Sequence, residues 1–521
     1  MMRVSRSFRI GGTFLSRYRR GGVRKPRLSE VGECIPIMTN FPRIILAGTN
    51  SGVGKTTVTI GLMLALKKKG LEVAPFKTGP DYIDTAYHFY ASQRSSCNLD
   101  TWMLPKDAVL ELFLRNVQGC NISIIEGVMG LYDGLEDTQR GSTAYLAKLL
   151  NCPVILIINA RSLSRSAAAV ALGFKQFDKQ LKISGIILNN IGSPNHFRYI
   201  KSVIESKTGI PVLGFLPHSP ELRLPERHLG LAPAWERKLE SGFLNRLSNL
   251  INRNMNLSLI LDIARSAPSI TLPKKTIFNF RLPRPDVTIA IAKDKAFNFY
   301  YQDNLEILKH LGAKVIEFSP LKDKELPKNI DGLYIGGGYP ELFASKLAQN
   351  TRLKKEIYQR AEQSLPIYAE CGGLMYLAKE LIDFKKRRFP MTGIFKCATR
   401  MGKGHNGLGY VELQTRKDNI LSKRGESLRG HIFHWSFLDN IPKDSDFAYR
   451  IKKNSTRFSK KHDCFAPSGL AMTVRNKVFY DGLIRNNVLA SYAHLHFASN
   501  LNIAKNFINR CKSYRDAKKT K

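Results

Sequence analysis

The sequence predicts an α/β protein with two doubly wound domains, the first of them built on a parallel sheet. Three observations support this fold class. Short apolar segments alternate with helical segments in both halves of the chain. Four prolines within residues 266–285 interrupt the alternation and indicate a linker. A chain of 521 residues is also long enough for two or more domains.

In the first domain, a buried strand at 43–48 is expected to precede a glycine-rich turn at 49–56 and an amphipathic helix at 57–69. The remaining apolar runs of this domain predict strands at 73–76, 122–125, 154–158, 183–188 and 212–216. The second domain is expected to contain strands at 287–292, 313–318, 332–335, 365–369, 408–413 and 488–492. The predicted domain division is a basic extension at 1–40, a first domain at 41–265, a linker at 266–285, a second domain at 286–505 and a basic tail at 506–521.

The first 40 residues have a composition of their own, with eight Arg and one Lys against two Glu. An organelle presequence is also Arg-rich and poor in acidic residues. The Gly pairs and Pro26 disfavour the amphipathic helix of such a presequence. We therefore expect a disordered arm, or a start of the chain at Met38, and a cytoplasmic protein, with organelle import as the lesser alternative.

The composition excludes several classes of function. Eight cysteines lie scattered without C-x-x-C spacing, which argues against a zinc site or a disulfide framework. No apolar segment is long enough to span a bilayer. The net charge of +39 reflects either general lysine and arginine enrichment or a polyanionic ligand. No nucleic-acid-binding motif accompanies this charge, so we predict neither a membrane nor a nucleic acid as partner.

The glycine-rich turn at 49–56 predicts a phosphate-binding loop of the P-loop type. Its amides would surround the phosphates of ATP, Lys55 would reach the β and γ oxygens, and the Thr56 hydroxyl would contact Mg²⁺. Thr49 stands where the strict motif has glycine, but the order of strand, loop and helix is retained. The predicted nucleotide-binding residues are Gly52, Gly54, Lys55, Thr56 and Thr57.

Acidic residues follow two of the predicted strands. Asp81 and Asp84 lie after the second strand, Glu126 ends a buried strand, and Asp133 follows it. Each carboxylate alone is compatible with turn or cap chemistry. Because the carboxyl ends of parallel strands meet in one crevice, we expect the four to converge there. We assign Glu126, together with Thr56, to Mg²⁺, and the three aspartates to the substrate, the metal or an intermediate.

A second site is predicted where the apolar run at 365–369 ends close to Cys371. The following Gly372 and Gly373 would begin a helix, whose amides lower the pKa of a thiol at its start. This geometry suits a nucleophile, although a buried structural cysteine is the alternative. Gly337 and Gly338 are the candidates for an oxyanion hole, and either His494 or His496 could serve as the base. His431 and His434 are candidates for ligand contacts or for the core.

These motifs together resemble a known family. The segments GTNSGVGKTT, FKTGPDYID, EGVMGLYDG, LPERHLGL, AFNFYYQDNLEIL, GGGYPELFA, YAECGGLMYL and LASYAHLHFAS occur in an order similar to that of the cobyrinic acid a,c-diamide synthases and their nickel-sirohydrochlorin counterparts. The resemblance extends from about residue 42 to about residue 508. The first half also resembles dethiobiotin synthetase, whose loop has the same departure at position 49. The second half resembles class I glutamine amidotransferases.

The resemblance implies that Cys371 is the nucleophile and His494 the base of a glutaminase. It further implies ATP- and Mg²⁺-dependent amidation of the a and c acetate groups of cobyrinic acid through an acyl phosphate. The implied partners are L-glutamine and a tetrapyrrole polycarboxylate, and a homodimer is allowed. In two places the sequence departs from the family pattern, since His496 replaces a usual Glu and Ile432 an acidic residue. The residue that orients His494 is therefore left unassigned.

Two alternative functions are compatible with the same motifs. In the first, the chemistry is unchanged but the macrocycle is hydrogenobyrinic acid or Ni-sirohydrochlorin. In the second, the chain is a P-loop regulatory ATPase with an inactive amidotransferase domain. The second alternative would be favoured by loss of Cys371 or His494, and both residues are present.

Overall fold

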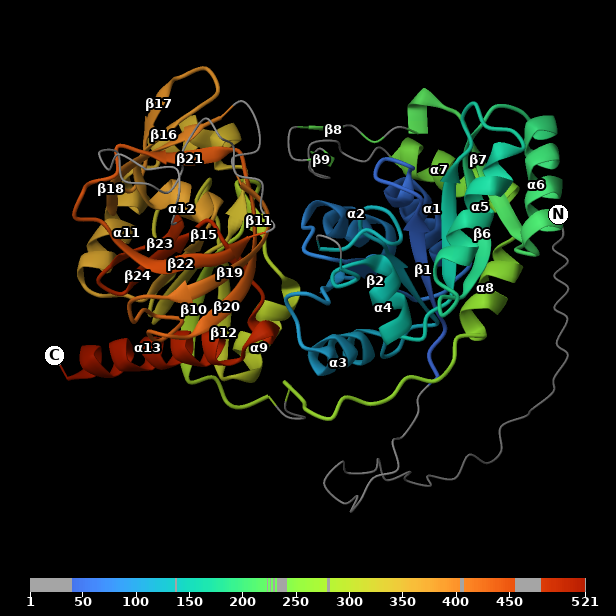
Figure 1. The fold of residues 1–521 in the computed structure, drawn as a ribbon. Coiled ribbons are helices and arrows are strands. Elements are labelled where there is room, and N and C mark those ends of the chain that lie inside the picture. Colours follow the sequence, from blue (N-terminus) through green and yellow to red (C-terminus); the bar gives the residue numbers. More distant parts are fainter. Residues whose placement is uncertain are drawn as a thin grey trace, which may run out of the picture. The chain divides into compact units, whose positions relative to one another are not determined.

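The computed structural model describes residues 40–520 except 136–137, 223, 225, 228–229, 232–240, 279–281, 403–406 and 455–478. The N-terminal extension predicted at 1–40 therefore lies, apart from its last residue, outside the described residues. Parts of the LPERHLGL motif and of the predicted linker also lie outside them. The described residues contain two large sheets with helices packed against each (Figure 1).

The first sheet has seven strands in the order β3-β2-β4-β1-β5-β6-β7, and every pair in it is parallel. Its central strands β1, β4 and β5 are mostly apolar and buried, as is usual where helices cover both faces of a parallel sheet. The strands are β1 (Arg43–Gly48), β2 (Val73–Thr78), β3 (Cys97–Leu99), β4 (Ile122–Glu126), β5 (Val154–Asn159), β6 (Ile183–Ile191) and β7 (Val212–Pro217). The helices are α1 (Lys55–Lys68), α2 (Ile83–Ser92), α3 (Lys106–Asn116), α4 (Thr143–Leu149), α5 (Ser166–Phe177), α6 (Pro194–Thr208), α7 (Ser241–Asn254) and α8 (Leu257–Arg265). A short hairpin of β8 (Glu226–Arg227) and β9 (Gly230–Leu231) follows β7.

The second sheet has ten strands in the order β12-β10-β13-β15-β24-β23-β22-β19-β20-β25. The pairs from β12 to β24 are parallel, and those from β24 to β25 are antiparallel. The strands are β10 (Val287–Ala292), β12 (Ala313–Phe318), β13 (Gly332–Ile335), β15 (Ile367–Glu370), β19 (Gly407–Thr415), β20 (Ser427–His434), β22 (Asp446–Asn454), β23 (Phe479–Arg485), β24 (Val488–Ser491) and β25 (His494–Leu495). Only the part of this sheet from β12 to β24 therefore has the parallel strands of a doubly wound fold.

Smaller elements complete the second half of the chain. The helices are α9 (Gln302–His310), α10 (Ala344–Gln349), α11 (Thr351–Glu362), α12 (Gly372–Leu377) and α13 (Asn502–Lys519). A separate sheet contains β16 (Ala378–Ile382), β17 (Arg388–Pro390), β18 (Phe395–Met401) and β21 (Ser436–Asp439). The two-residue β14 (Gly337–Gly338) pairs with β11 (Phe297–Phe299). Helix α13 extends across residue 505, where the sequence predicts a boundary, and buries Phe507, Ile508 and Cys511.

The segment predicted as a linker is held against the first domain. Glu111 on α3 accepts hydrogen bonds from the amides of Ile277 (2.5 Å) and Phe278 (3.0 Å). The Phe278 ring lies under Arg115, at 4.3 Å, and 4.9 Å from the ring of His310 on α9. These contacts fix the path of the chain between the two sheets.

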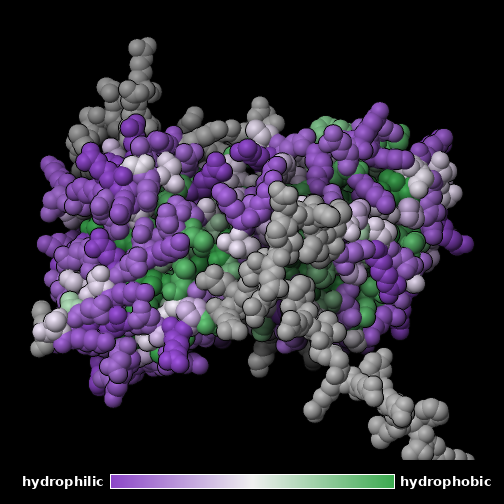
Figure 2. Space-filling view, turned by 90° about the horizontal axis from the view of Figure 1, so that it is seen from below, coloured by the Kyte–Doolittle hydropathy of each residue, from purple (hydrophilic) through white to green (hydrophobic). Residues whose placement is uncertain are grey.

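The surface is consistent with the high net charge. On the face shown in Figure 2, hydrophilic side chains cover most of the coloured surface, and hydrophobic ones occupy smaller areas. Among the described residues, we find no helix whose length and apolar character would allow it to cross a membrane.

Candidate functional site

The glycine-rich loop after β1 forms the cradle that the sequence predicts. Gly54 has φ +98°, and a Cβ there would lie 2.2 Å from Nδ2 of Asn189, so only glycine fits. Asn189 in turn donates to the Val53 carbonyl at 2.8 Å and holds the loop. Helix α1 begins at Lys55, directly after this turn. The loop amides and the helix N-terminus together provide an anion-binding site.

Lys55 points into the loop and is already partly satisfied by backbone oxygens. Its Nζ donates to the carbonyls of Met129 (2.6 Å) and Asn50 (3.2 Å). Burial, followed by the charge of Lys77, lowers the pKa of Lys55 to about 8. A bound phosphate would place a negative charge in direct contact with the Lys55 ammonium group.

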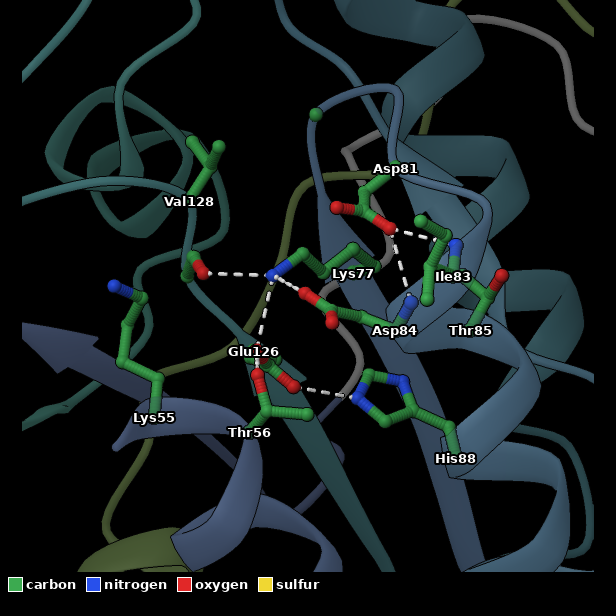
Figure 3. Close-up of polar contacts among 12 residues, drawn as sticks. Lys55, Thr56, Lys77, Asp81, Ile83, Asp84, Thr85, His88, Glu126 and Val128 are labelled. Atoms are coloured by element: carbon green, nitrogen blue, oxygen red, sulfur yellow. Dashed lines mark hydrogen bonds and ion pairs between the residues drawn. The ribbon is translucent and has the colours of Figure 1, made fainter. Parts of the chain in front are cut away.

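Glu126, at the end of β4, is the centre of a buried polar cluster (Figure 3). One of its oxygens accepts hydrogen bonds from the Thr56 hydroxyl (2.7 Å) and Lys77 (3.0 Å), and the other contacts Nε2 of His88 (2.7 Å). Lys77 also forms an ion pair with Asp84 at 2.6 Å. Burial alone would raise the pKa of Glu126, but Lys77, His88 and Thr56 hold it well below its usual range. Glu126 is therefore an anion in the folded protein.

Lys77 and His88 were not predicted from the sequence. Lys77 lies at the end of β2 and His88 on α2, and both reach Glu126 from elements distant in the chain. Nδ1 of His88 also contacts Oγ of Ser96 at 3.0 Å, which fixes the ring. No local motif marks a histidine on a helix as the partner of a strand-end carboxylate.

The three predicted aspartates have different positions. Asp81 caps α2, since its Oδ1 accepts from the amides of Ile83 (2.7 Å) and Asp84 (2.9 Å). Asp81, Asp84 and Glu126 line a common cavity of about 730 Å³. Asp133 is not among the described residues that line it, and its Oδ2 instead accepts from the Gly130 amide at 2.7 Å. The expected convergence thus holds for three carboxylates, whereas the fourth fixes a neighbouring turn.

The same cavity brings together residues from the phosphate loop and from several strand ends. All five predicted nucleotide-binding residues, Gly52, Gly54, Lys55, Thr56 and Thr57, line it. Further lining groups that the sequence did not indicate include Arg161, Asn190 and His218. This volume and lining suit a large polyanionic ligand.

Cys371 lies at the turn between β15 and α12, as predicted. It has φ +46° and ψ −99°, a strained conformation that for a residue with a side chain costs about 1–3 kcal/mol. A Cβ at Gly372 would lie 3.0 Å from the Gly338 amide nitrogen, and one at Gly373 would lie 2.3 Å from the Ile335 carbonyl oxygen. Gly373 is therefore required by close packing, and a side chain at 372 would crowd the Gly338 backbone. Strain of this kind concentrates at functional sites and agrees with a nucleophile held on a tight turn.

His494 is the histidine that meets Cys371, and the structure supplies the group that orients it. Nδ1 of His494 lies 3.3 Å from Oε2 of Glu370, the residue directly before the cysteine. Oε1 of Glu370 accepts from the Tyr368 hydroxyl (2.5 Å) and the Leu495 amide (3.2 Å). Burial lowers the pKa of His494, but hydrogen bonds to Cys371 and Glu370 outweigh it and raise the pKa to about 10. Cysteine, histidine and glutamate form a triad.

His496, which stands where the wider class usually has Glu, does not lie beside the triad. Nε2 of His496 lies 3.8 Å from Oδ2 of Asp303, and its ring packs 4.7 Å from that of Tyr301. Its Nδ1 accepts from the Ala498 amide at 3.2 Å. His496 therefore takes no part in orienting His494. Glu370 was missed because only the parallel pairing of β15 with β24 brings together two residues that are 124 positions apart.

The predicted oxyanion glycines lie beside the triad. A Cβ at Gly337 would lie 2.7 Å from Cε1 of His494, so no side chain fits there. Gly338 has φ +155° and would place a Cβ 2.1 Å from the Ala296 carbonyl oxygen. Both glycines are required by packing, and the Gly338 amide nitrogen lies next to the start of α12.

The other two histidines differ from each other. Nδ1 of His434 donates to the Ser436 carbonyl at 2.7 Å, and its ring stacks on Tyr492 with centroids 3.8 Å apart, which places it in the core. The ring of His431 lies 6.1 Å from that of His494. Burial lowers the pKa of His431 to about 3, which keeps it neutral. His431 is thus the one of the pair that faces the triad.

The fold and these two sites define a nucleotide-binding α/β domain joined to a glutamine amidotransferase domain. Family models match both parts: residues 44–231 match the CobQ/CobB/MinD/ParA nucleotide binding domain, and residues 288–501 match the CobB/CobQ-like glutamine amidotransferase domain. These matches confirm the predicted fold class and the use of a nucleotide.

Curated relatives cover almost the whole chain. "Cobyrinate a,c-diamide synthase" of Dehalococcoides mccartyi is 43% identical over 477 residues, which cover 91% of this chain and 99% of the relative. Proteins of the same name from Caldanaerobacter subterraneus and Methanosarcina barkeri are 40% and 39% identical, covering 90% and 92% of this chain and 98% of each relative. The chain belongs to the cobyrinate a,c-diamide synthase family, as the order of its motifs indicates.

Proposed function

We propose that this chain uses ATP and L-glutamine to amidate the a and c acetate carboxylates of cobyrinic acid in corrinoid biosynthesis. The observation that carries this proposal is the presence of two complete sites in one chain. One is a phosphate cradle with an ionised glutamate, and the other is a Cys371–His494–Glu370 triad. The relatives' shared name supplies the substrate.

The first site activates a carboxylate. A carboxylate is a poor acyl donor because its leaving group would be oxide. Transfer of the γ-phosphoryl group of ATP to a carboxylate oxygen gives an acyl phosphate and ADP, and ammonia then displaces phosphate to give the amide. Lys55 and the loop amides hold the β and γ oxygens in place, and Lys77 lies at the same cavity to neutralise a carboxylate or phosphate.

The pair Thr56 and Glu126 fits a Mg²⁺ ion. Mg²⁺ prefers oxygen ligands, and the Thr56 hydroxyl and the Glu126 carboxylate lie side by side at the same cavity, 2.7 Å apart. A bound Mg²⁺ would neutralise charge on the phosphate oxygens. His88 and Lys77 hold the Glu126 carboxylate beside the Thr56 hydroxyl. Asp81 and Asp84 are proposed to contact the substrate or an intermediate at this cavity. Asp133 is proposed to act indirectly, because its carboxylate holds the turn at Gly130.

The second site releases ammonia from glutamine. The thiolate of Cys371 attacks the side-chain amide carbon, and the amides near Gly337 and Gly338 are proposed to stabilise the resulting oxyanion. The His494 imidazolium gives its proton to the departing nitrogen, so ammonia leaves and a glutamyl thioester remains. His494 then takes a proton from water as the water oxygen attacks the thioester. Glutamic acid leaves and ionises to glutamate, and the Cys371 thiolate and the His494 imidazolium are restored. The ammonia travels to the acyl phosphate within the protein.

Several broader features belong to the same proposal. We take residues 41–265 as the ATP-dependent amidoligase domain, 266–285 as the linker and 286–505 as the glutaminase domain. A cytoplasmic location and a homodimer are proposed on the resemblance alone. Part of the basic excess is proposed to attract the polycarboxylate substrate.

Product mass analysis with cobyrinic acid, glutamine, ATP and Mg²⁺ tests the proposal, and we expect a diamide. Parallel reactions with hydrogenobyrinic acid and Ni-sirohydrochlorin identify the macrocycle, and no turnover of any of the three would reject the amidation chemistry. Cys371→Ser should abolish glutaminase activity and leave ammonia-supported amidation intact. If both proteins hydrolysed glutamine equally, the assignment of the nucleophile would be wrong.

A further inference from the structure

The chain bends directly before His494, between two strands that pair with different neighbours. Strand β24 pairs with β15 and β23, whereas β25, which begins at His494, pairs with β20. Tyr492 and Ala493 lie between the two strands and are fully buried. Their amides have therefore left the strand ladder in a place that water does not reach, and each needs another acceptor.

The buried carboxylate of Asp481, on β23, is that acceptor. Its Oδ1 accepts from the amides of Tyr492 (3.0 Å) and Gly482 (2.7 Å). Its Oδ2 accepts from the Ala493 amide (2.9 Å) and the Ser491 hydroxyl (2.6 Å). An ionised carboxylate has about four acceptor positions. Asp481, which is 1% exposed, thus uses its whole capacity, and three of its four donors belong to the bend.

The same bend is joined to both reactive groups of the glutaminase. The Ser491 carbonyl accepts a hydrogen bond from the Cys371 amide at 2.7 Å, which ties the bend to the strained turn. His494 follows Ala493 directly, so the direction of the backbone at 492 and 493 determines where the imidazole begins. Asp481 thus acts on the nucleophile through Ser491 and on the base through Ala493.

We propose that Asp481 is a positioning residue of the glutaminase, which keeps Cys371 and His494 in register by fixing the bend between β24 and β25. This inference rests on the proposed function, because it concerns the site that releases ammonia. A displacement of about 1 Å can reduce the rate of a reaction about 100-fold when it separates two reacting groups. A carboxylate is required here, since three N–H groups and a hydroxyl donate to it.

The substitution Asp481→Asn separates this role from simple packing. The amide has nearly the shape of the carboxylate but only one acceptor oxygen, so its NH₂ group faces donors that it cannot satisfy. The bend then moves, and the hydrogen bonds of His494 with Cys371 and Glu370 weaken. These are the contacts that raise the pKa of His494 to about 10.

The pH dependence of glutamine hydrolysis measures this movement. Protonated His494 is required for the departing ammonia, so kcat/KM falls as the pH rises through the pKa of His494. In Asp481→Asn this pKa should move toward its ordinary value of 6.5, and the alkaline limb of kcat/KM should move down by at least about one pH unit. The rings of His431 and Tyr82 also face His494, but burial lowers the pKa of the first to about 3 and raises that of the second, so neither titrates in this interval.

The effect should fall on kcat and not on the binding of glutamine. We expect kcat for glutamine hydrolysis to fall by about 100-fold in Asp481→Asn. KM should change little, because Asp481 is buried and its hydrogen bonds go to the protein itself. Ammonia-supported amidation, which bypasses the glutaminase, should keep the wild-type rate.

The matched control is Asp331→Asn. Asp331 is another buried carboxylate of the same sheet, and its Oδ2 accepts from the Thr288 amide at 2.8 Å. It precedes β13, at the opposite end of the parallel strands from Cys371. The control should therefore keep both the kcat and the pH profile of the wild type.

A second variant keeps the test decisive if Asp481→Asn does not fold. Ser491→Ala removes the hydroxyl that donates to Asp481 and leaves the backbone hydrogen bonds in place. It should lower kcat by less than about tenfold and move the alkaline limb in the same direction.

The inference is overturned if folded Asp481→Asn keeps the pH profile of the wild type, if its only defect is a higher KM for glutamine, or if Asp331→Asn shifts the profile equally. It is also overturned if Asp481→Asn does not fold and Ser491→Ala matches the wild type.

An NMR titration of histidine-labelled protein measures the pKa of His494 without turnover, and His494→Gln identifies its signal. We expect a lower pKa in Asp481→Asn than in the wild type, and equal values would overturn the inference. A wild type that hydrolysed glutamine but formed no amide from cobyrinic acid would contradict the proposed function alone. A wild type that hydrolysed no glutamine would also contradict the proposed function, and the NMR titration would then decide the inference by itself.

Discussion

The two sites of this chain hold their reactive groups in opposite ways. The synthetase groups line a cavity of about 730 Å³ and include two lysines and three carboxylates. The glutaminase triad is enclosed, with Cys371 6%, His494 1% and Glu370 0% exposed. One site is a cavity lined by charged groups, and the other is a packed set of side chains in contact with one another.

This difference follows from what each site must bind. A triphosphate brings several negative charges, and the lysines that would meet it are held by carboxylates and backbone oxygens around the same cavity. Glutamine is a small ligand with no net charge, and the nucleophile must be ready before it binds. The strained backbone of Cys371 and the tight glycine contacts around it hold the thiol in position before glutamine binds.

The largest effect is expected from removing the cation of the first site. Lys55→Met should reduce amidation by about 1,000-fold with either glutamine or ammonia, because a main contact to the β and γ oxygens is lost. Basal glutaminase activity should persist, since Lys55 takes no part in the triad. Steady-state assays with both nitrogen donors measure this. Lys68→Met, an exposed lysine on the same helix, is the control. Loss of basal glutaminase in Lys55→Met would contradict the separation of the two sites.

A smaller effect is expected from Glu370→Gln, and it falls on the glutaminase instead of the synthetase. The amide keeps the shape of the side chain but removes the charge that orients His494 and supports its protonated form. Glutaminase kcat should fall by about 100-fold, within the range that general acid–base catalysis contributes, while ammonia-supported amidation stays unchanged. Asp303→Asn alters the carboxylate beside His496 and should leave the glutaminase near its wild-type rate. Equal rates for Glu370→Gln and the wild type would exclude Glu370 from the triad.

The smallest effect concerns pH and stability. The folded-state pKa of His494, about 10, lies above its ordinary value of 6.5, so protonation of His494 stabilises the folded protein. This contribution is complete below about pH 6.5 and is lost as the pH rises toward about 10. The difference in free energy of unfolding between wild type and His494→Gln should therefore shrink over that interval, as urea titrations can measure. Cys371→Ala removes one cause of the raised pKa and should weaken the trend. A difference that grows with pH would contradict it.

Local order along the chain determined much of what could be predicted. The phosphate loop is a strand, a turn and a helix in succession, so Gly54, Lys55 and Thr56 could be assigned from their neighbours alone. The same applies to Cys371, whose strand, turn and glycine pair are contiguous. The parallel first sheet was predictable from the alternation of apolar runs, whereas the antiparallel half of the second sheet was not. Its strands, such as β20, β22 and β23, pair with one another without the crossover helices that mark parallel strands.

The sequence by itself thus determined which reactive groups this protein has: a phosphate cradle, a strand-end glutamate, a thiol on a strand-to-helix turn and a late histidine. Only the tertiary structure decided how they are held. Glu370 orients His494, and His88 holds Glu126. These pairs join residues that are far apart in the chain, and their contacts depend on how strands order themselves and how the domains meet. Such long-range distances leave no periodicity or spacing in the sequence, which is why the partners of the reactive groups were not predicted.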